Sequence, residues 1–156
     1  MSDARSRANQ SLYLGNILLR AWRQNLLEED IPASTLQLAF HPAVVQHLQA
    51  AYGWFLVEVA DVESSPGAAP PRCVDELPAL PEGRAQCAEL RELQSHERAG
   101  FLAPLERSRS EVAPRRNNAN ALPTVGNAGS DIADVEAWAR DFAGICERMR
   151  NSLDEC

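Results

Sequence analysis

Lysine is absent from this sequence, and aromatic residues are few. All 15 basic residues are arginine, against 22 acidic ones, so the formal charge is −7. An acidic chain repels a polyanion, which argues against nucleic-acid binding. Aromatic residues make up 6% of the chain, and no long stretch alternates apolar and polar residues, so the sequence has little of what builds a β-sheet.

Metal-binding and membrane-spanning patterns are missing as well. The cysteines are Cys73, Cys87, Cys146 and Cys156. They form no C-x-x-C pair and no zinc-ligand spacing with the three histidines, so we expect no metal, no other cofactor, and free thiols. No signal segment follows the first residues, and the most apolar stretch, residues 50–60, is too short to span a bilayer. We therefore expect a cytoplasmic protein with no membrane contact.

The chain is rich in helix-forming residues that follow amphipathic patterns. Apolar residues recur at helical spacing over four segments, at about residues 3–29, 42–62, 84–103 and 131–153. Pro42 suits the first position of the second helix, with a short helical turn at 34–40 before it. On the first helix, Leu14 and Ile17 belong to the expected apolar face, and on the third Cys87 does. The pattern predicts one all-α domain over residues 1–156, a four-helix bundle.

Two long connectors interrupt the helices. Residues 63–83 hold five of the ten prolines, which favour extended backbone. Residues 106–129 hold several Arg, Asn and Gly and few large apolar residues, so we expect a mobile segment. Either connector is long enough to cross over the bundle, so the sequence leaves the topology open.

The N-terminal stretch Arg7-Ala8-Asn9-Gln10-Ser11-Leu12-Tyr13-Leu14, followed by Ala21-Trp22-Arg23, resembles the opening of a family of short bacterial proteins classed as a domain of unknown function. The helix that carries Trp138 is loosely similar too. The resemblance implies a helical fold and a bacterial source. It implies no activity, cofactor or catalytic residue.

One pair of residues has the spacing of a nuclease motif. Arg91 and His96, with four residues between them, resemble the motif of the helical HEPN ribonucleases, in which the resemblance implies action on the RNA phosphodiester. Arginine stabilises phosphate charge, and histidine moves protons. On a continuous helix, however, the two side chains diverge by about 140°. A solvated helix face explains the pair equally, and we favour that interpretation.

The polar side of the second helix is a candidate partner surface. His47, Trp54, Glu58 and Asp61 follow helical spacing there. A large ring opposite the main apolar face is unusual, and a tryptophan beside charged groups is typical of interfaces. The alternative, which we favour, is that Trp54 packs against a neighbouring helix or the proline-rich connector as part of the core.

Four arginines gather in the second connector: Arg107, Arg109, Arg115 and Arg116. A mobile arginine cluster binds phosphate or an acidic partner. We favour the simpler interpretation, a solvated loop whose charge offsets the acidic bundle.

These patterns favour a non-enzymatic interaction or adaptor protein over an enzyme. The expected partner is an unidentified protein, and a homodimer is compatible with the sequence. The alternative function is a HEPN-like ribonuclease or toxin–antitoxin component that uses Arg91 and His96. Loss of ribonuclease activity in His96→Ala would support that alternative.

Limited proteolysis tests the expected mobility of the second connector. An Arg-directed protease should cut first within residues 106–129, although eleven of the 15 arginines lie elsewhere, because a segment with so little apolar surface does not fix itself. The two fragments should stay associated on a native gel. First cuts inside the helical segments would contradict this prediction.

Overall fold

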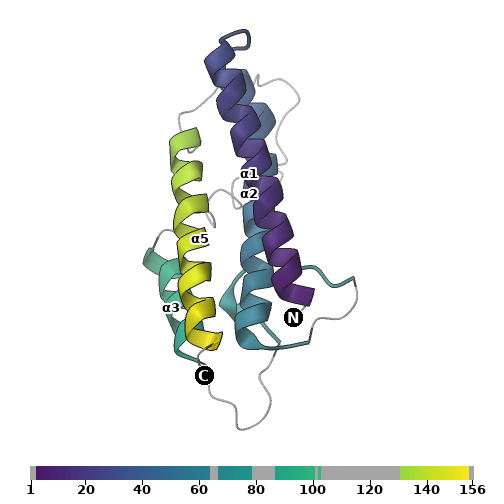
Figure 1. Ribbon diagram of the computed structural model, residues 1–156, viewed down its shortest axis with the longest axis vertical. Helices are drawn as coiled ribbons and strands as arrows, with labels where there is room; N and C mark the ends of the chain where they lie inside the picture. The colour runs from purple at the N-terminus through teal and green to yellow at the C-terminus, as the bar shows by residue number, and fades with distance from the viewer. Residues whose placement is uncertain (1–2, 64–66, 79–86, 101, 103–130, 155–156) are drawn as a thin grey trace, which may run out of the picture.

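The computed structural model describes residues 3–63, 67–78, 87–100, 102 and 131–154. Within these ranges the chain forms helices and no strand: α1 (Asp3–Glu28), α2 (Ala33–Ala60), the 3₁₀ turn η1 (Val74–Glu76), α3 (Ala88–Ala99) and α5 (Ile132–Asp154). The prediction of an all-α fold is confirmed, and the four α-helices agree with a four-helix bundle (Figure 1). Residues 106–129, with the predicted connector and its four arginines, lie outside the described ranges.

Helix α2 is the centre of the fold. From Ala51 to Ala60, every residue except Glu58 is buried. A helix that is apolar on all sides must be covered on all sides. The lower part of α2 is accordingly packed against α1, α3, α5 and the proline-rich connector, while its upper part packs with α1 and α5.

Helix α1 packs closely along α2 and runs antiparallel to it (Figure 1). The buried face of α1 begins with Ala4, Ala8 and Gly15, whose small size lets the two backbones approach. A Cβ at Gly15 would lie 3.5 Å from the Cβ of His47. Trp22 then fills the upper core and is 1% exposed.

The predicted face of α1 was partly wrong. Leu14 and Ile17 are each 38% exposed. The stretch of α1 that meets α2 includes the small residues, so the buried stripe is rotated away from these two large side chains. Helical periodicity detects an apolar stripe but does not show which edge of it the neighbouring helix covers.

The predicted start of the second helix was also wrong. Helix α2 begins at Ala33 and continues through Pro42, so the turn expected at 34–40 belongs to the same helix. Proline within a helix loses one hydrogen bond. Packing on both sides of the proline holds this segment helical: Leu36 and Val44 are buried, and the ring of Phe40 stacks on Trp22 with centroids 6.3 Å apart.

Helix α5 lies beside α1 and runs parallel to α2 (Figure 1). The predicted start of α5 at Asp131 is confirmed. The Asp131 carboxylate accepts a hydrogen bond from the backbone N–H of Ile132, the first helical residue, at 2.6 Å. Its apolar face, with Val135, Phe142 and Met149, is buried as expected.

Helix α3 covers the lower core only and is shorter than predicted. It spans Ala88–Ala99 rather than 84–103, and Gly100 ends it. Cys87, expected within the helix, is its half-buried N-cap. Residues 84–86, 101 and 103 of the predicted helix lie outside the described ranges. Leu90 and Leu93 fill the core, and Glu97 accepts hydrogen bonds from the Tyr52 hydroxyl and the backbone N–H of Val74, at 2.6 and 2.8 Å.

The proline-rich connector crosses α2 at Gly53. A Cβ on Gly53 would lie 2.1 Å from the carbonyl oxygen of Pro71 and 2.8 Å from the Cβ of Pro70. No side chain fits at such a contact, so the absence of a Cβ is what allows the connector to lie on the helix.

Replacing Gly53 by alanine tests this crossing. Gly53→Ala should lower the free energy of unfolding by about 1–3 kcal/mol, because the connector must move off α2. The matched control is Gly144→Ala on α5, where a new Cβ meets nothing within 4 Å and should stabilise the helix by about 0.5–1 kcal/mol. Chemical denaturation measures both. Equal, stabilising effects would contradict the tight crossing.

Candidate binding groove between α1 and α5

Helices α1 and α5 share apolar residues of the upper core, and polar side chains link them at both ends of their contact. Near the chain termini, Arg150 of α5 donates to the Asn9 side chain of α1 at 2.9 Å. Toward the other end, Arg23 of α1 forms a two-pronged ion pair with Glu136 of α5, with Arg23 Nε 3.1 Å from Glu136 Oε1. The two helices are therefore joined by charged contacts at both ends.

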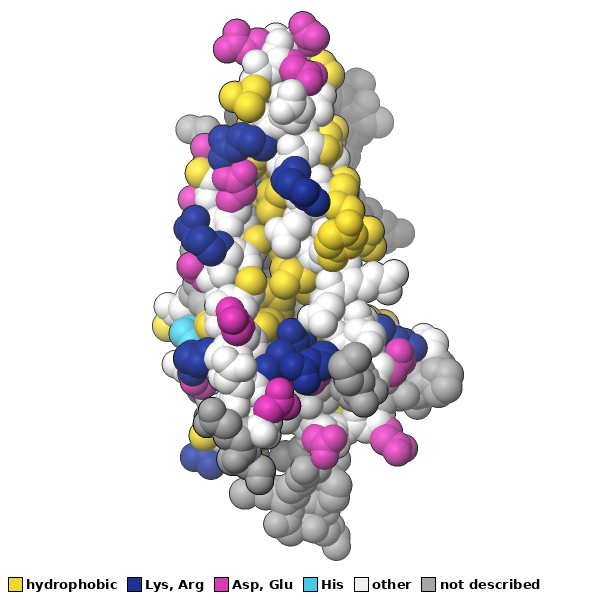
Figure 2. Space-filling model, in the orientation of Figure 1, with side chains coloured by type: hydrophobic (Ala, Val, Ile, Leu, Met, Phe, Trp, Pro, Cys, Tyr) yellow, Lys and Arg dark blue, Asp and Glu magenta, His cyan; other side chains and the backbone are white. Residues whose placement is uncertain are grey.

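A groove of about 600 Å³ lies between these contacts. Leu19 and two alanines of α5 contribute its apolar lining. Figure 2 shows this face of the molecule, where dark blue side chains flank a yellow strip between the two helices. The lining residues are Asn16, Leu19, Arg20, Arg23, Gln24, Glu136, Ala139, Arg140 and Ala143.

The charge of this groove is opposite to that of the whole chain. Three arginines line it, against Glu136 alone. Glu136 is already engaged by Arg23, and the hydrogen bond from Arg23 to Glu136 raises the pKa of that guanidinium. Arg140 lies 3.9 Å from Asp141 and is largely exposed. Arg20 makes no ion pair with any residue in the described ranges, so positive charge remains available over an apolar floor.

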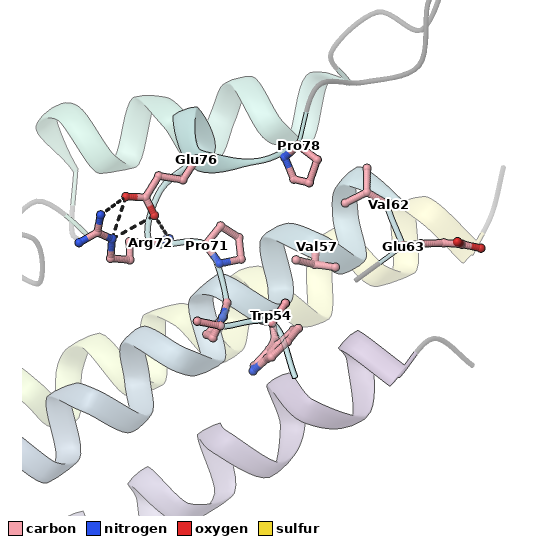
Figure 3. Close-up of a pocket in the computed structure, with 11 residues that line it drawn as sticks. Trp54, Val57, Val62, Glu63, Pro71, Arg72, Glu76 and Pro78 are labelled. Carbon is pink, nitrogen blue, oxygen red and sulfur yellow. Dashed lines mark hydrogen bonds and ion pairs between the residues drawn. The ribbon is translucent and has the colours of Figure 1, made fainter. Parts of the chain in front are cut away.

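A second hollow, of about 410 Å³, lies between α2 and the proline-rich connector (Figure 3). Trp54, Val57 and Pro71 line it. Of its three charged lining residues, Arg72 and Glu76 pair with each other, with Arg72 Nε donating to Glu76 Oε1 at 2.7 Å, and the third is Glu63. Because the single arginine of this hollow is already paired, the groove between α1 and α5 is the better candidate site for an acidic partner.

The four residues of the predicted partner surface do not share one exposed face. Trp54 is 7% exposed, and the Arg7 guanidinium lies 4.6 Å from its ring centroid. Glu58 faces α5 and binds Arg150. Asp61 is exposed in a left-handed conformation at the end of α2, and His47 is half-buried near Gly15.

Arg91 and His96 both lie on the continuous helix α3, where five residues separate them by about 140° around the axis. Arg91 is exposed, and His96 Nε2 lies 3.6 Å from the Glu92 carboxylate. The structure therefore does not direct the two side chains toward one point. No group of three or more potential metal ligands occurs among the described residues, and no helix in those ranges is long and apolar enough to cross a membrane.

The groove was not predicted from the sequence, and no role was predicted for Arg20, Arg23 or Arg140. A signal was present in the three-residue spacing of Arg20 and Arg23, which places both on one face. Nothing in the sequence indicates that this face lies beside Arg140.

A partly buried polar cluster lies at the end of the groove nearest the termini. Arg150 donates from Nε and from its second terminal nitrogen to the two oxygens of Glu58, at 2.9 and 2.7 Å. The two side chains are only 15% and 9% exposed. Burial acts to lower the pKa of Arg150, but the hydrogen bond and charge of Glu58 outweigh it and raise the pKa. In the same region, burial raises the pKa of the Cys146 thiol to about 12, which leaves it protonated and unreactive.

The chain belongs to a family of unknown function, DUF6586, whose family model matches residues 1–156. This agrees with the resemblance seen at the N-terminus to a domain-of-unknown-function family. No curated protein and no solved structure matches the chain.

Breaking the Glu58–Arg150 pair should destabilise the fold. Arg150→Met leaves the Glu58 carboxylate, which is 9% exposed, with only the more distant guanidinium of Arg5, whose Nε lies 3.5 Å away. The free energy of unfolding should therefore fall by roughly 3 kcal/mol, the low end of the range for buried pairs. The double variant with Glu58→Met should recover much of the loss. The control Arg148→Met breaks only the exposed pair with Glu92 and should cost about 1 kcal/mol or less. Equal losses in Arg150→Met and Arg148→Met would contradict this role.

Proposed function

We propose that this DUF6586 member is a non-enzymatic interaction protein that binds an acidic segment of a partner protein in the groove between α1 and α5. The observation that carries the proposal is Arg20, a guanidinium with no ion-pair partner among the described residues, placed beside an apolar floor. The remaining positive charge and the apolar floor together suit a segment that alternates carboxylates with aliphatic side chains.

Arginine chemistry supports a carboxylate partner. The planar guanidinium donates two parallel hydrogen bonds to a carboxylate and is more weakly hydrated than an ammonium group, so it enters interfaces at lower cost. Arg20 and Arg140 stand on opposite sides of Leu19 and Ala139. A bound segment would place acidic side chains on both sides and apolar ones between them.

The contacts at the two ends of the groove support the same function. The Arg23–Glu136 pair and the Glu58–Arg150–Asn9 cluster link the two walls to each other. A preformed groove spends less of the binding energy on ordering its own side chains.

The bacterial cytoplasm is the compartment that we propose. Cys73, Cys87 and Cys146 are free thiols, which is the state that a reducing compartment maintains.

Peptide binding tests the groove. A fluorescently labelled peptide of Glu, Ala and Leu should bind the wild-type protein, and fluorescence anisotropy measures the affinity. Arg20→Glu combined with Arg140→Glu should weaken binding about tenfold or more, since attraction becomes repulsion at both walls. Added salt should weaken binding as well.

Two controls make the result specific. A peptide with Gln in place of Glu should bind poorly to the wild-type protein. Arg98→Glu, an exposed arginine near the end of α3, makes the same kind of charge change away from the groove and should leave binding unaltered. Equal binding of the Glu and Gln peptides, or equal loss in Arg98→Glu, would contradict the proposed function.

A further inference from the structure

The connection between α1 and α2 forms an acidic tip at one end of the molecule. Glu28, Glu29 and Asp30 follow one another there, all exposed. Leu27, directly before them, is 71% exposed, and Ile31, directly after them, is 42% exposed. The tip therefore combines three carboxylates with two exposed aliphatic side chains.

The tip and the groove lie on the same face. Leu27 follows Arg20 by seven residues on α1, which is about two helical turns and returns to nearly the same side of the helix. Glu28 accepts a hydrogen bond from Gln24, a groove-lining residue, at 2.9 Å. Figure 2 shows magenta side chains at the tip above the groove on one surface.

We propose that the acidic segment that occupies the groove is the tip of a second copy of this chain. The inference rests on the proposed function of the groove and names its partner. The tip carries what the groove lacks, carboxylates beside exposed aliphatic side chains, while the groove carries unsatisfied guanidinium charge beside an apolar floor. Charge and apolar surface are complementary at both.

A chain does not reach its own groove with its own tip. Arg20 and Leu27 belong to the same rigid helix and lie about 10 Å apart along its axis. A second copy rotated by a two-fold axis brings each tip to the other copy's groove, and a two-fold arrangement makes both contacts equivalent. The result is a closed dimer in which the faces formed by α1 and α5 meet head to head.

The net charge of the chain sets the conditions for this dimer. Two copies of charge −7 repel each other at long range. At physiological salt the screening length is about 8 Å, which weakens that repulsion more than the direct contacts between the tip and the groove. The few apolar side chains involved suit a weak, concentration-dependent dimer rather than an obligate one.

Sedimentation equilibrium over a range of protein concentrations tests the dimer. The wild-type protein should pass from monomer to dimer as concentration rises. Reversing the tip with Glu28→Arg and Asp30→Arg should raise the dimer dissociation constant about tenfold or more, and reversing the groove with Arg20→Glu and Arg140→Glu should do the same. A chain with all four substitutions should dimerise again, because each reversed tip meets a reversed groove.

The matched control is Arg98→Glu, an exposed position on α3 outside the tip, the groove and the faces formed by α1 and α5, and it should dimerise as the wild-type protein does. Restored dimerisation of the fourfold variant also shows that neither the tip reversal nor the groove reversal merely unfolds the chain. A wild-type protein that stays monomeric, or a fourfold variant that fails to recover, would overturn the dimer. A wild-type protein that stays monomeric at every concentration but binds the Glu-containing peptide would leave the proposed function standing and overturn only this inference.

Discussion

The structure depends on one constraint, the burial of α2 on all sides. Between Ala51 and Ala60 this helix offers almost no polar surface to water, so each side needs a neighbour that covers it. The neighbouring segments reach close contact with α2 in different ways. Helix α1 approaches with Ala4, Ala8 and Gly15, and the connector crosses where Gly53 has no side chain. The fold therefore consists of the central helix α2 and the segments that pack around it.

The neighbours of α2 meet one another through polar groups, because their apolar sides are already turned inward. Helices α1 and α5 are joined by Arg23–Glu136 at one end and by Arg150 with Asn9 at the other, where Arg150 also binds Glu58 of α2. The first pair is exposed and the Arg150–Glu58 pair is mostly buried, and pairs of either kind contribute little net stability when compared with apolar packing. They fix which residues face each other, and the spacing between them leaves the groove.

Charge is distributed unevenly over an acidic molecule. Carboxylates collect at the tip of the hairpin, and arginines collect in the groove two turns away. Evenly mixed positive and negative charges would largely cancel within each region, whereas separated charges leave an electrostatic potential that attracts a charged partner. Because the chain has no lysine, each positive group in the groove is a planar guanidinium, which is suited to binding carboxylates.

The sequence by itself determined the helical class and the start of α5 at Asp131, because helix propensity, periodicity and capping are local properties. It did not determine that α2 continues through Pro42, since the stacking of Phe40 on Trp22 holds that segment. It also gave no indication that Arg20, Arg23 and Arg140 meet, and only the tertiary structure joined them into a groove. Periodicity describes one helix at a time. Which sides meet is decided by packing between residues more than a hundred positions apart, such as Arg23 and Glu136.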